Sequence, residues 1–63
     1  MDASDVLVDE LDNKVQKLRE WLGSGQAKDY PDYQKICGEI RGLLFAKQYI
    51  LDLKQKMENS DDE

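Results

Sequence analysis

The 63-residue chain contains no histidine, one cysteine and one proline, and these scarcities exclude several classes of protein. Without histidine, neither a His-based catalytic triad nor an imidazole acid–base relay can form. Cys37 has no second cysteine with which to close an intrachain disulfide, and one thiol is no zinc ligand cluster. We therefore expect a protein that is not an enzyme and holds no metal or cofactor, with Cys37 as a packed structural thiol.

Long apolar runs and clustered positive charge are also missing. The longest apolar run, residues 43–46, is far shorter than the roughly 20 residues that span a bilayer. Nine Lys and Arg against fourteen Asp and Glu give a net charge of −5, which disfavours binding to a nucleic-acid backbone. The start of the chain has no basic and apolar signal segment. These features predict a cytoplasmic protein with neither a membrane nor a nucleic acid as partner.

A heptad pattern marks the first predicted helix, residues 4–22. Asp2 or Ser4 can cap its start, where acidic side chains suit the positive end of the helix dipole. Gly23 is expected to end the helix in the left-handed conformation. Apolar residues recur at alternating spacings of three and four, as in the seam of a coiled coil: Val8, Leu11, Val15, Leu18 and Leu22.

The second predicted helix covers residues 31–58. Pro31 suits a first helical position, because its missing N–H would be unpaired there, and it disfavours helical geometry at Tyr30. Residues 59–63, Asn-Ser-Asp-Asp-Glu, are expected to form an acidic disordered tail. The predicted organisation is thus one helical-hairpin domain, residues 1–58, followed by the tail 59–63.

The predicted fold class is all-α, an antiparallel two-helix hairpin. The alignment brings Leu22 near Tyr33 and Val8 near Lys47, so that the second helix overhangs the first beyond about Leu51. Charge supports this topology, because residues 1–12 carry five acids and no base, whereas all nine bases lie within residues 13–57. The main stripe, which packs against the first helix, comprises Tyr33, Ile36, Cys37, Ile40, Leu43, Leu44, Ile50, Leu51 and Met57.

Two lysines interrupt the main stripe where apolar residues are expected. Lys47 and Lys54 face the acidic start of the first helix in an antiparallel hairpin. One interpretation is that their stems cover the seam while their ammonium groups reach acidic side chains, namely Asp5, Asp9 and Asp12. The other interpretation is that both lysines simply extend into solvent.

A second stripe lies on the opposite side of the second predicted helix. At about 100° per residue it groups Gly38, Gly42, Phe45, Tyr49 and Leu53. Each interior glycine costs about 1 kcal/mol relative to alanine, and two glycines one turn apart leave a groove that another helix can approach. One short helix covers only one stripe. The second stripe, together with the overhanging Met57, therefore predicts an interface with another chain.

Two other interpretations of the second stripe stay open. The rings of Phe45 and Tyr49 could fold over their own helix, with the glycines incidental. Alternatively, the glycine pair kinks or breaks the second helix and produces a three-helix arrangement. The first helix could also choose the second stripe, in which case the main stripe would need another partner.

Residues 33–50, Tyr-Gln-Lys-Ile-Cys-Gly-Glu-Ile-Arg-Gly-Leu-Leu-Phe-Ala-Lys-Gln-Tyr-Ile, carry a resemblance to known proteins. Through its Tyr…Ile-Cys-Gly…Gly-Leu…Ala pattern, this stretch resembles a segment of short helical proteins of tailed bacteriophages, encoded near virion-morphogenesis genes. The resemblance implies expression in a bacterial cytoplasm and a structural, assembly or host-takeover role. In length and hairpin shape the chain also resembles Rop-type plasmid proteins. Its sequence departs from theirs and has no convincing basic RNA-binding face, so no function is carried over.

The preferred functional prediction is a non-catalytic, self-associating structural or assembly protein. Hairpins, most simply two, would pack through the second stripe into a four-helix or larger bundle in the bacterial cytoplasm or a virion. The alternative is an acidic inhibitor or adaptor that occupies a basic site on a nucleic-acid-handling host enzyme, through the acids of residues 2–12 and 58–63. An RNA-binding bundle is less favoured, because it requires these basic residues to converge: Lys14, Lys17, Arg19, Lys35 and Arg41.

Overall fold

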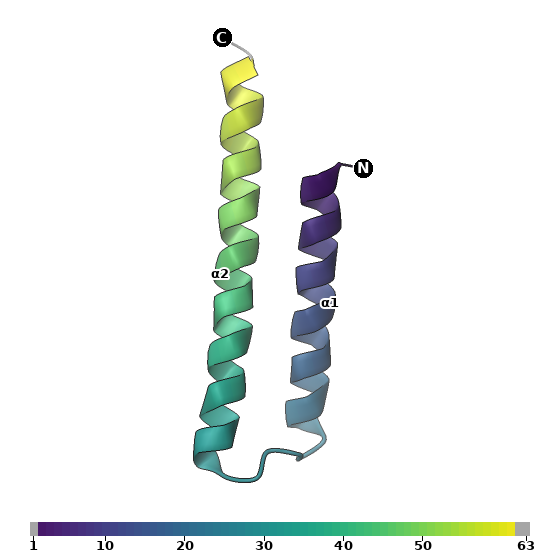
Figure 1. Ribbon diagram of the computed structural model, residues 1–63, viewed down its shortest axis with the longest axis vertical. Helices are drawn as coiled ribbons and strands as arrows, with labels where there is room; N and C mark the ends of the chain where they lie inside the picture. Colours follow the sequence, from purple (N-terminus) through teal and green to yellow (C-terminus); the bar gives the residue numbers. More distant parts are fainter. Residues whose placement is uncertain (1, 62–63) are drawn as a thin grey trace.

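The computed structural model describes residues 2–61 as two antiparallel helices joined by a short connector (Figure 1). α1 spans Ala3–Gly23, and α2 spans Tyr30–Asp61. The predicted all-α hairpin is therefore confirmed. Because the two helices lie side by side in one layer, the molecule is slender, with extents of 52 × 20 × 12 Å.

A reciprocal pair of aspartates begins α1. The Asp5 backbone N–H donates to the Asp2 side chain over 3.0 Å, and the Asp2 N–H donates back to the Asp5 side chain over 3.4 Å. This is a capping box in which aspartate takes both places. Asp2, rather than Ser4, is therefore the N-cap of α1.

The end of α1 differs from the prediction made for Gly23. Gly23 is still helical, and Gly25 instead adopts the left-handed conformation, with a φ of 77°. The Gly25 N–H donates to the Leu22 carbonyl, and the Ser24 hydroxyl donates to the Trp21 carbonyl. The left-handed residue comes two positions later than predicted because the helix continues to its cap at Ser24 before the chain turns.

α2 begins at Tyr30, one residue earlier than predicted. The Asp29 side chain accepts from the Asp32 N–H over 2.9 Å, and the Asp32 side chain accepts from the Lys28 N–H over 3.1 Å. Asp29 thus caps α2, and Pro31 occupies the second helical position, where an N–H would also be unpaired. These capping bonds outweigh the tendency of a proline to exclude its preceding residue from a helix.

α2 is continuous through Gly38 and Gly42 and ends at Asp61. The interpretation that the glycine pair breaks this helix into two is therefore wrong. The predicted end at residue 58 is also wrong, because residues 59–61 continue the helix, and Ser60 Oγ donates to the Lys56 carbonyl over 3.0 Å. The rest of the predicted tail, residues 62–63, lies outside the described residues.

The core is a thin seam between the helices. Val15, only 4% exposed, is the single buried side chain among the described residues. Leu44 was assigned to this seam but is 38% exposed, because the heptad spacing runs from Leu43 to Lys47 and leaves Leu44 at the edge. The half-buried residues around Val15 are Val8, Leu11, Leu18, Leu22, Ile36, Ile40, Leu43 and Ile50.

Two ion pairs mark the register between the helices. Facing residues of two antiparallel helices have numbers with a constant sum. Lys47 pairs with Asp12 and Lys54 with Asp5, and each pair gives a sum of 59. The predicted alignment of Val8 with Lys47 adds to 55, so the observed register is shifted by about one helical turn. α1 consequently begins beside Lys54, and the overhang of α2 comprises residues 55–61 instead of everything beyond Leu51 (Figure 1).

Candidate interaction surface

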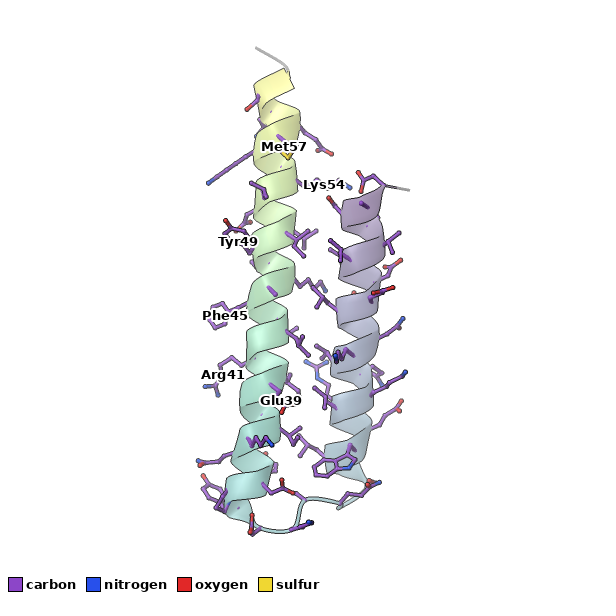
Figure 2. All side chains as sticks on the ribbon, in the orientation of Figure 1. Glu39, Arg41, Phe45, Tyr49, Lys54 and Met57 are labelled. Atoms are coloured by element: carbon purple, nitrogen blue, oxygen red, sulfur yellow. The ribbon has the colours of Figure 1, made fainter. Side chains whose placement is uncertain are left out.

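Lys47 and Lys54 occupy seam positions of α2 and reach across to α1. The Lys47 Nζ atom lies 2.8 Å from Asp12 Oδ1. The Lys54 Nζ atom lies 2.7 Å from Asp5 Oδ1, and Figure 2 shows this side chain pointing toward α1. The interpretation in which these lysines extend toward the acidic start of α1 is confirmed. Their charges are therefore neutralised inside the hairpin.

The Lys54 ammonium lies between two carboxylates, since Asp2 Oδ2 is 3.7 Å away. The hydrogen bond from Lys54 lowers the pKa of the Asp5 carboxyl, and the bond from the Asp2 N–H lowers it further. The same contact with Asp5 raises the pKa of Lys54. Asp2 thus takes the place that was predicted for Asp9, and the contact between Asp5 and Lys54 favours the charged form of both.

The second stripe of α2 faces away from α1. Phe45 is 71% exposed and Tyr49 70% exposed, while Met57 is 63% and Leu53 47% exposed. Figure 2 shows Phe45 and Tyr49 projecting from the side of α2 opposite α1, and Met57 on the overhang. Rings this exposed bury little of their area against their own helix. The predicted contact residues therefore form one open surface along α2.

Gly38 and Gly42 serve no packing purpose within the hairpin. A Cβ atom added at either position would meet no non-neighbouring atom within 4 Å. Neither glycine has a positive φ, so neither needs the conformational freedom of glycine. Because an interior helical glycine costs about 1 kcal/mol relative to alanine, the isolated hairpin would be more stable with alanine at both positions. What the two glycines leave is open space on the surface of α2, on the side that carries the exposed aromatic rings.

A shallow hollow flanks the second stripe and is lined by Arg41, Leu44, Phe45 and Gln48. These positions are spaced i, i+3, i+4 and i+7, the diamond of four residues that receives one side chain of a neighbouring helix in coiled coils. Sequence reasoning missed this hollow because two of its four residues are polar. The sequence signal that could have predicted it is the apolar pair Leu44 and Phe45, with the long side chains of Arg41 and Gln48 about one turn before and after.

The hairpin exposes more surface than a compact protein of its length. Its accessible surface is 5144 Å², whereas a compact monomer of 63 residues exposes about 4,200 Å². The excess of about 1,000 Å² is comparable to the roughly 800 Å² that each partner buries in a standard protein interface. One additional interface per chain would therefore bring the protein to an ordinary degree of burial.

Other kinds of site find less support in the described residues. The Cys37 thiol is free and half-buried. Among residues 2–61, no three metal-ligating side chains gather, and neither helix combines the length and apolar character that a membrane crossing needs. No family model matches the chain, and no curated protein or solved structure is similar to it. The second stripe is consequently the feature from which a function is inferred.

Proposed function

We propose that this protein is a non-catalytic, self-associating helical module with a structural or assembly role, whose second stripe docks a second copy. The observation that carries the proposal is the pairing of exposed Phe45 and Tyr49 with two glycines that serve nothing inside the hairpin. Aromatic residues are enriched in protein interfaces, and glycines let two helices approach closely. The excess surface of the hairpin is sufficient for one standard interface.

The thin core of the hairpin also favours association. Val15 is the one buried side chain among residues 2–61. A chain this short buries little apolar surface to offset the entropy lost on ordering, and small proteins commonly gain stability from a partner. Docking through α2 would give a four-helix assembly in which the two long helices lie in the middle and each α1 lies outside.

The resemblance of residues 33–50 to short phage proteins extends the proposal to a biological setting. It favours a component of a virion, or of its assembly, made in a bacterial cytoplasm. A rod-like hairpin that pairs through one face suits such a role, because assembly needs defined contacts and no reacting groups.

An acidic inhibitor or adaptor is the second candidate. The antiparallel fold supports it by bringing the start of α1 and the end of α2, where most of the acids lie, to the same end of the molecule (Figure 1). However, three of the five acids in residues 1–12 already pair with lysines of α2. Since the remaining acidic surface is smaller than the sequence alone indicates, self-association is the preferred function.

The RNA-binding bundle is the weakest candidate. Arg41 projects from the side of α2 that faces away from α1 (Figure 2). Lys14, Lys17 and Arg19 belong to α1. A single hairpin therefore divides these basic residues between two helices, with Arg41 on the side away from α1, which makes a common surface for a phosphate backbone less favourable.

Size-exclusion chromatography with light scattering tests the proposed self-association. The wild-type chain is expected to be a dimer at high micromolar concentration. Gly42→Leu fills the groove, so it should give a monomer whose circular dichroism is still helical, because leucine favours helix. Asn13→Leu places the same side chain at an exposed position of α1 and should leave the dimer intact. A monomeric wild type, or a dimer indifferent to Gly42→Leu, overturns the proposal.

The inhibitor candidate has a separate test. If acidic side chains hold a basic host enzyme, capture from bacterial lysate should yield one nucleic-acid-handling enzyme at low salt and lose it at high salt. The double variant Asp9→Asn, Glu10→Gln should lose this capture, whereas Gly42→Leu should keep it. Capture that persists in the double variant would rule out these acids as the contact.

A further inference from the structure

We infer that the second copy docks antiparallel, with the two α2 helices overlapping along their whole length about a twofold axis beside Phe45. This inference rests on the proposed self-association and specifies its geometry. Three features of α2 point to the same arrangement: the sizes of the facing side chains, the overlap of the helices, and the opposite charges of Arg41 and Asp52 at one edge of the second stripe. The repulsion of Lys35 and the partner's Lys56, which face each other in this register, opposes it.

Side-chain size along the second stripe is self-complementary in the antiparallel direction. In a pair whose facing residue numbers add to 91, Gly42 faces the partner's Tyr49. In the same register, Gly38 faces the partner's Leu53. Each large side chain then lies over a glycine, where the surface of α2 has free space. In a parallel, in-register pair, glycine would face glycine and Tyr49 would face Tyr49, which leaves a gap at one level and overcrowds the other.

The described part of α2 overlaps its copy fully in this same register. α2 runs from Tyr30 to Asp61, and 30 and 61 also add to 91. The two helices therefore overlap from end to end, and the midpoint falls between Phe45 and Ala46. The overhang, residues 55–61, which α1 leaves uncovered, then lies beside the first two turns of the partner's α2. Docking would therefore cover the part of α2 that extends beyond α1 in the single hairpin.

Arg41 and Asp52 flank the second stripe on one edge of α2, about 20° apart on the helical wheel. Among residues 2–61, Arg41 forms no ion pair, while Asp52 accepts a hydrogen bond from Gln48 over 3.0 Å. Antiparallel docking about a twofold axis brings the same edge of each α2 together, so Arg41 lies near the partner's Asp52. Their residue numbers add to 93, within two of the sum of 91 that defines the register. Twofold symmetry makes this contact twice.

The overall charge distribution favours the same direction. Residues 2–13 and 42–61, at the open end, carry eight acids and three bases, whereas residues 14–41, at the connector end, carry six bases and four acids. Antiparallel docking lays each negative end beside the positive half of the partner. The excess acids lie on α1, outside the α2 interface, so parallel docking would add only long-range repulsion between the two negative ends.

The hollow beside Phe45 fits this arrangement as well. In the antiparallel register, the partner's Phe45 lies at the height of the hollow lined by Arg41, Leu44, Phe45 and Gln48. Because the twofold axis passes beside Phe45, each ring enters the hollow of the other copy. The exposed ring of one hairpin is thereby covered by the other.

Distances between spin labels separate antiparallel from parallel docking. In a Cys37→Ser background, a label at Gln34→Cys should lie about 35 Å from its copy in an antiparallel dimer, since 23 residues separate the two positions at about 1.5 Å each. A parallel dimer would bring these labels within about 20 Å, because packed helix axes lie only about 10 Å apart. Mixing chains labelled at Gln34→Cys with chains labelled at Asn59→Cys should add a short distance, because 34 and 59 nearly face each other.

Charge reversal tests the contact between Arg41 and Asp52. Either Arg41→Asp or Asp52→Arg should weaken dimerisation about tenfold at low salt, because the contact occurs twice and turns repulsive. The double variant should return to within about threefold of the wild type. Arg19→Asp, at an exposed position of α1, is the matched control and should change dimerisation little.

The outcomes separate the two claims. Absence of any distance between copies, together with a monomeric mass, overturns self-association and the docking geometry together. A dimer with a short distance between the Gln34→Cys labels overturns antiparallel docking alone. A double charge reversal no better than either single one overturns the proposed ion pairs. A long distance for Gln34→Cys, with a short one in the mixture, supports the inference.

Discussion

The main stripe and the second stripe run along the same helix, yet the residues that interrupt their patterns have different surroundings. On the main stripe, Lys47 and Lys54 break the apolar pattern, and α1 supplies carboxylates at both places. On the second stripe, Phe45 and Tyr49 break the polar pattern of a surface, and the described chain supplies nothing to cover them. A local exception to binary patterning thus indicates a contact: α1 supplies it on the main stripe, and the proposed second copy would supply it on the second stripe.

Placing a charge in the seam should cause the largest loss of stability among these changes. Val15→Asp puts a carboxylate without a partner at the most buried position, which costs several kcal/mol, as much as the stability of many small domains. Helical circular dichroism at 25 °C should collapse. Val6→Asp, at a 45% exposed position of α1, should remain folded. A folded Val15→Asp hairpin would show that the seam is not what holds the helices together.

Removing an aromatic ring from the second stripe should break association and leave the hairpin intact. Phe45→Ala or Tyr49→Ala is expected to raise the dimer Kd about 30-fold, since buried aromatic hot spots contribute about 2 kcal/mol or more. Sedimentation equilibrium measures this change, with helicity checked by circular dichroism. Leu7→Ala, at a half-exposed position of α1, is the control. Equal weakening by all three variants would argue against a localised interface.

The glycines of the connector and of the second stripe should respond in opposite directions. Gly25→Ala forces a side chain into the left-handed conformation and should destabilise the hairpin by about 1 kcal/mol. Gly42→Ala should stabilise the dilute, monomeric hairpin by about 1 kcal/mol, because nothing opposes the added Cβ, yet weaken the dimer. Thermal unfolding at low and high concentration separates the two effects. A dilute Gly42→Ala hairpin less stable than the wild type would mean that the hairpin itself needs this glycine.

The ion pair between Lys54 and Asp5 should have the smallest effect, visible through pH. Asp5 has a lowered pKa, so its stabilisation is present above the ordinary value of 3.8 and fades as the pH falls through the lower folded value. Lys54 has a raised pKa, so its stabilisation is complete below 10.5 and fades as the pH rises further.

The Tm difference between wild type and Lys54→Met measures this pair. Whatever its size at pH 7, the difference should be constant between about pH 5 and 9 and should change in acid and in strong alkali. Lys28→Met, in the connector, provides the matched comparison. A Tm difference that stays flat down to pH 2 would contradict the contribution of Asp5.

The ends of the helices were predictable only to within a few residues. Caps at Asp2 and Asp29, and the left-handed Gly25, depend on which of several neighbouring polar groups reaches an unpaired backbone N–H or carbonyl. Gly23 and Gly25 look equally suitable in the sequence, since either can take a positive φ. Which of them turns the chain depends on how far α1 continues before Ser24 caps it.

Periodicity along the chain was enough to predict two helices and the two stripes of α2, because spacings of three and four residues are local properties. The segregation of acids and bases along the chain supported the antiparallel order. The register between the helices depended on their packing, since sliding one heptad seam along another by about a turn keeps apolar residues in contact. The pairs of Lys47 with Asp12 and Lys54 with Asp5 select one such position. Which stripe stays exposed was likewise decided by packing, because both are apolar and α1 can cover only one.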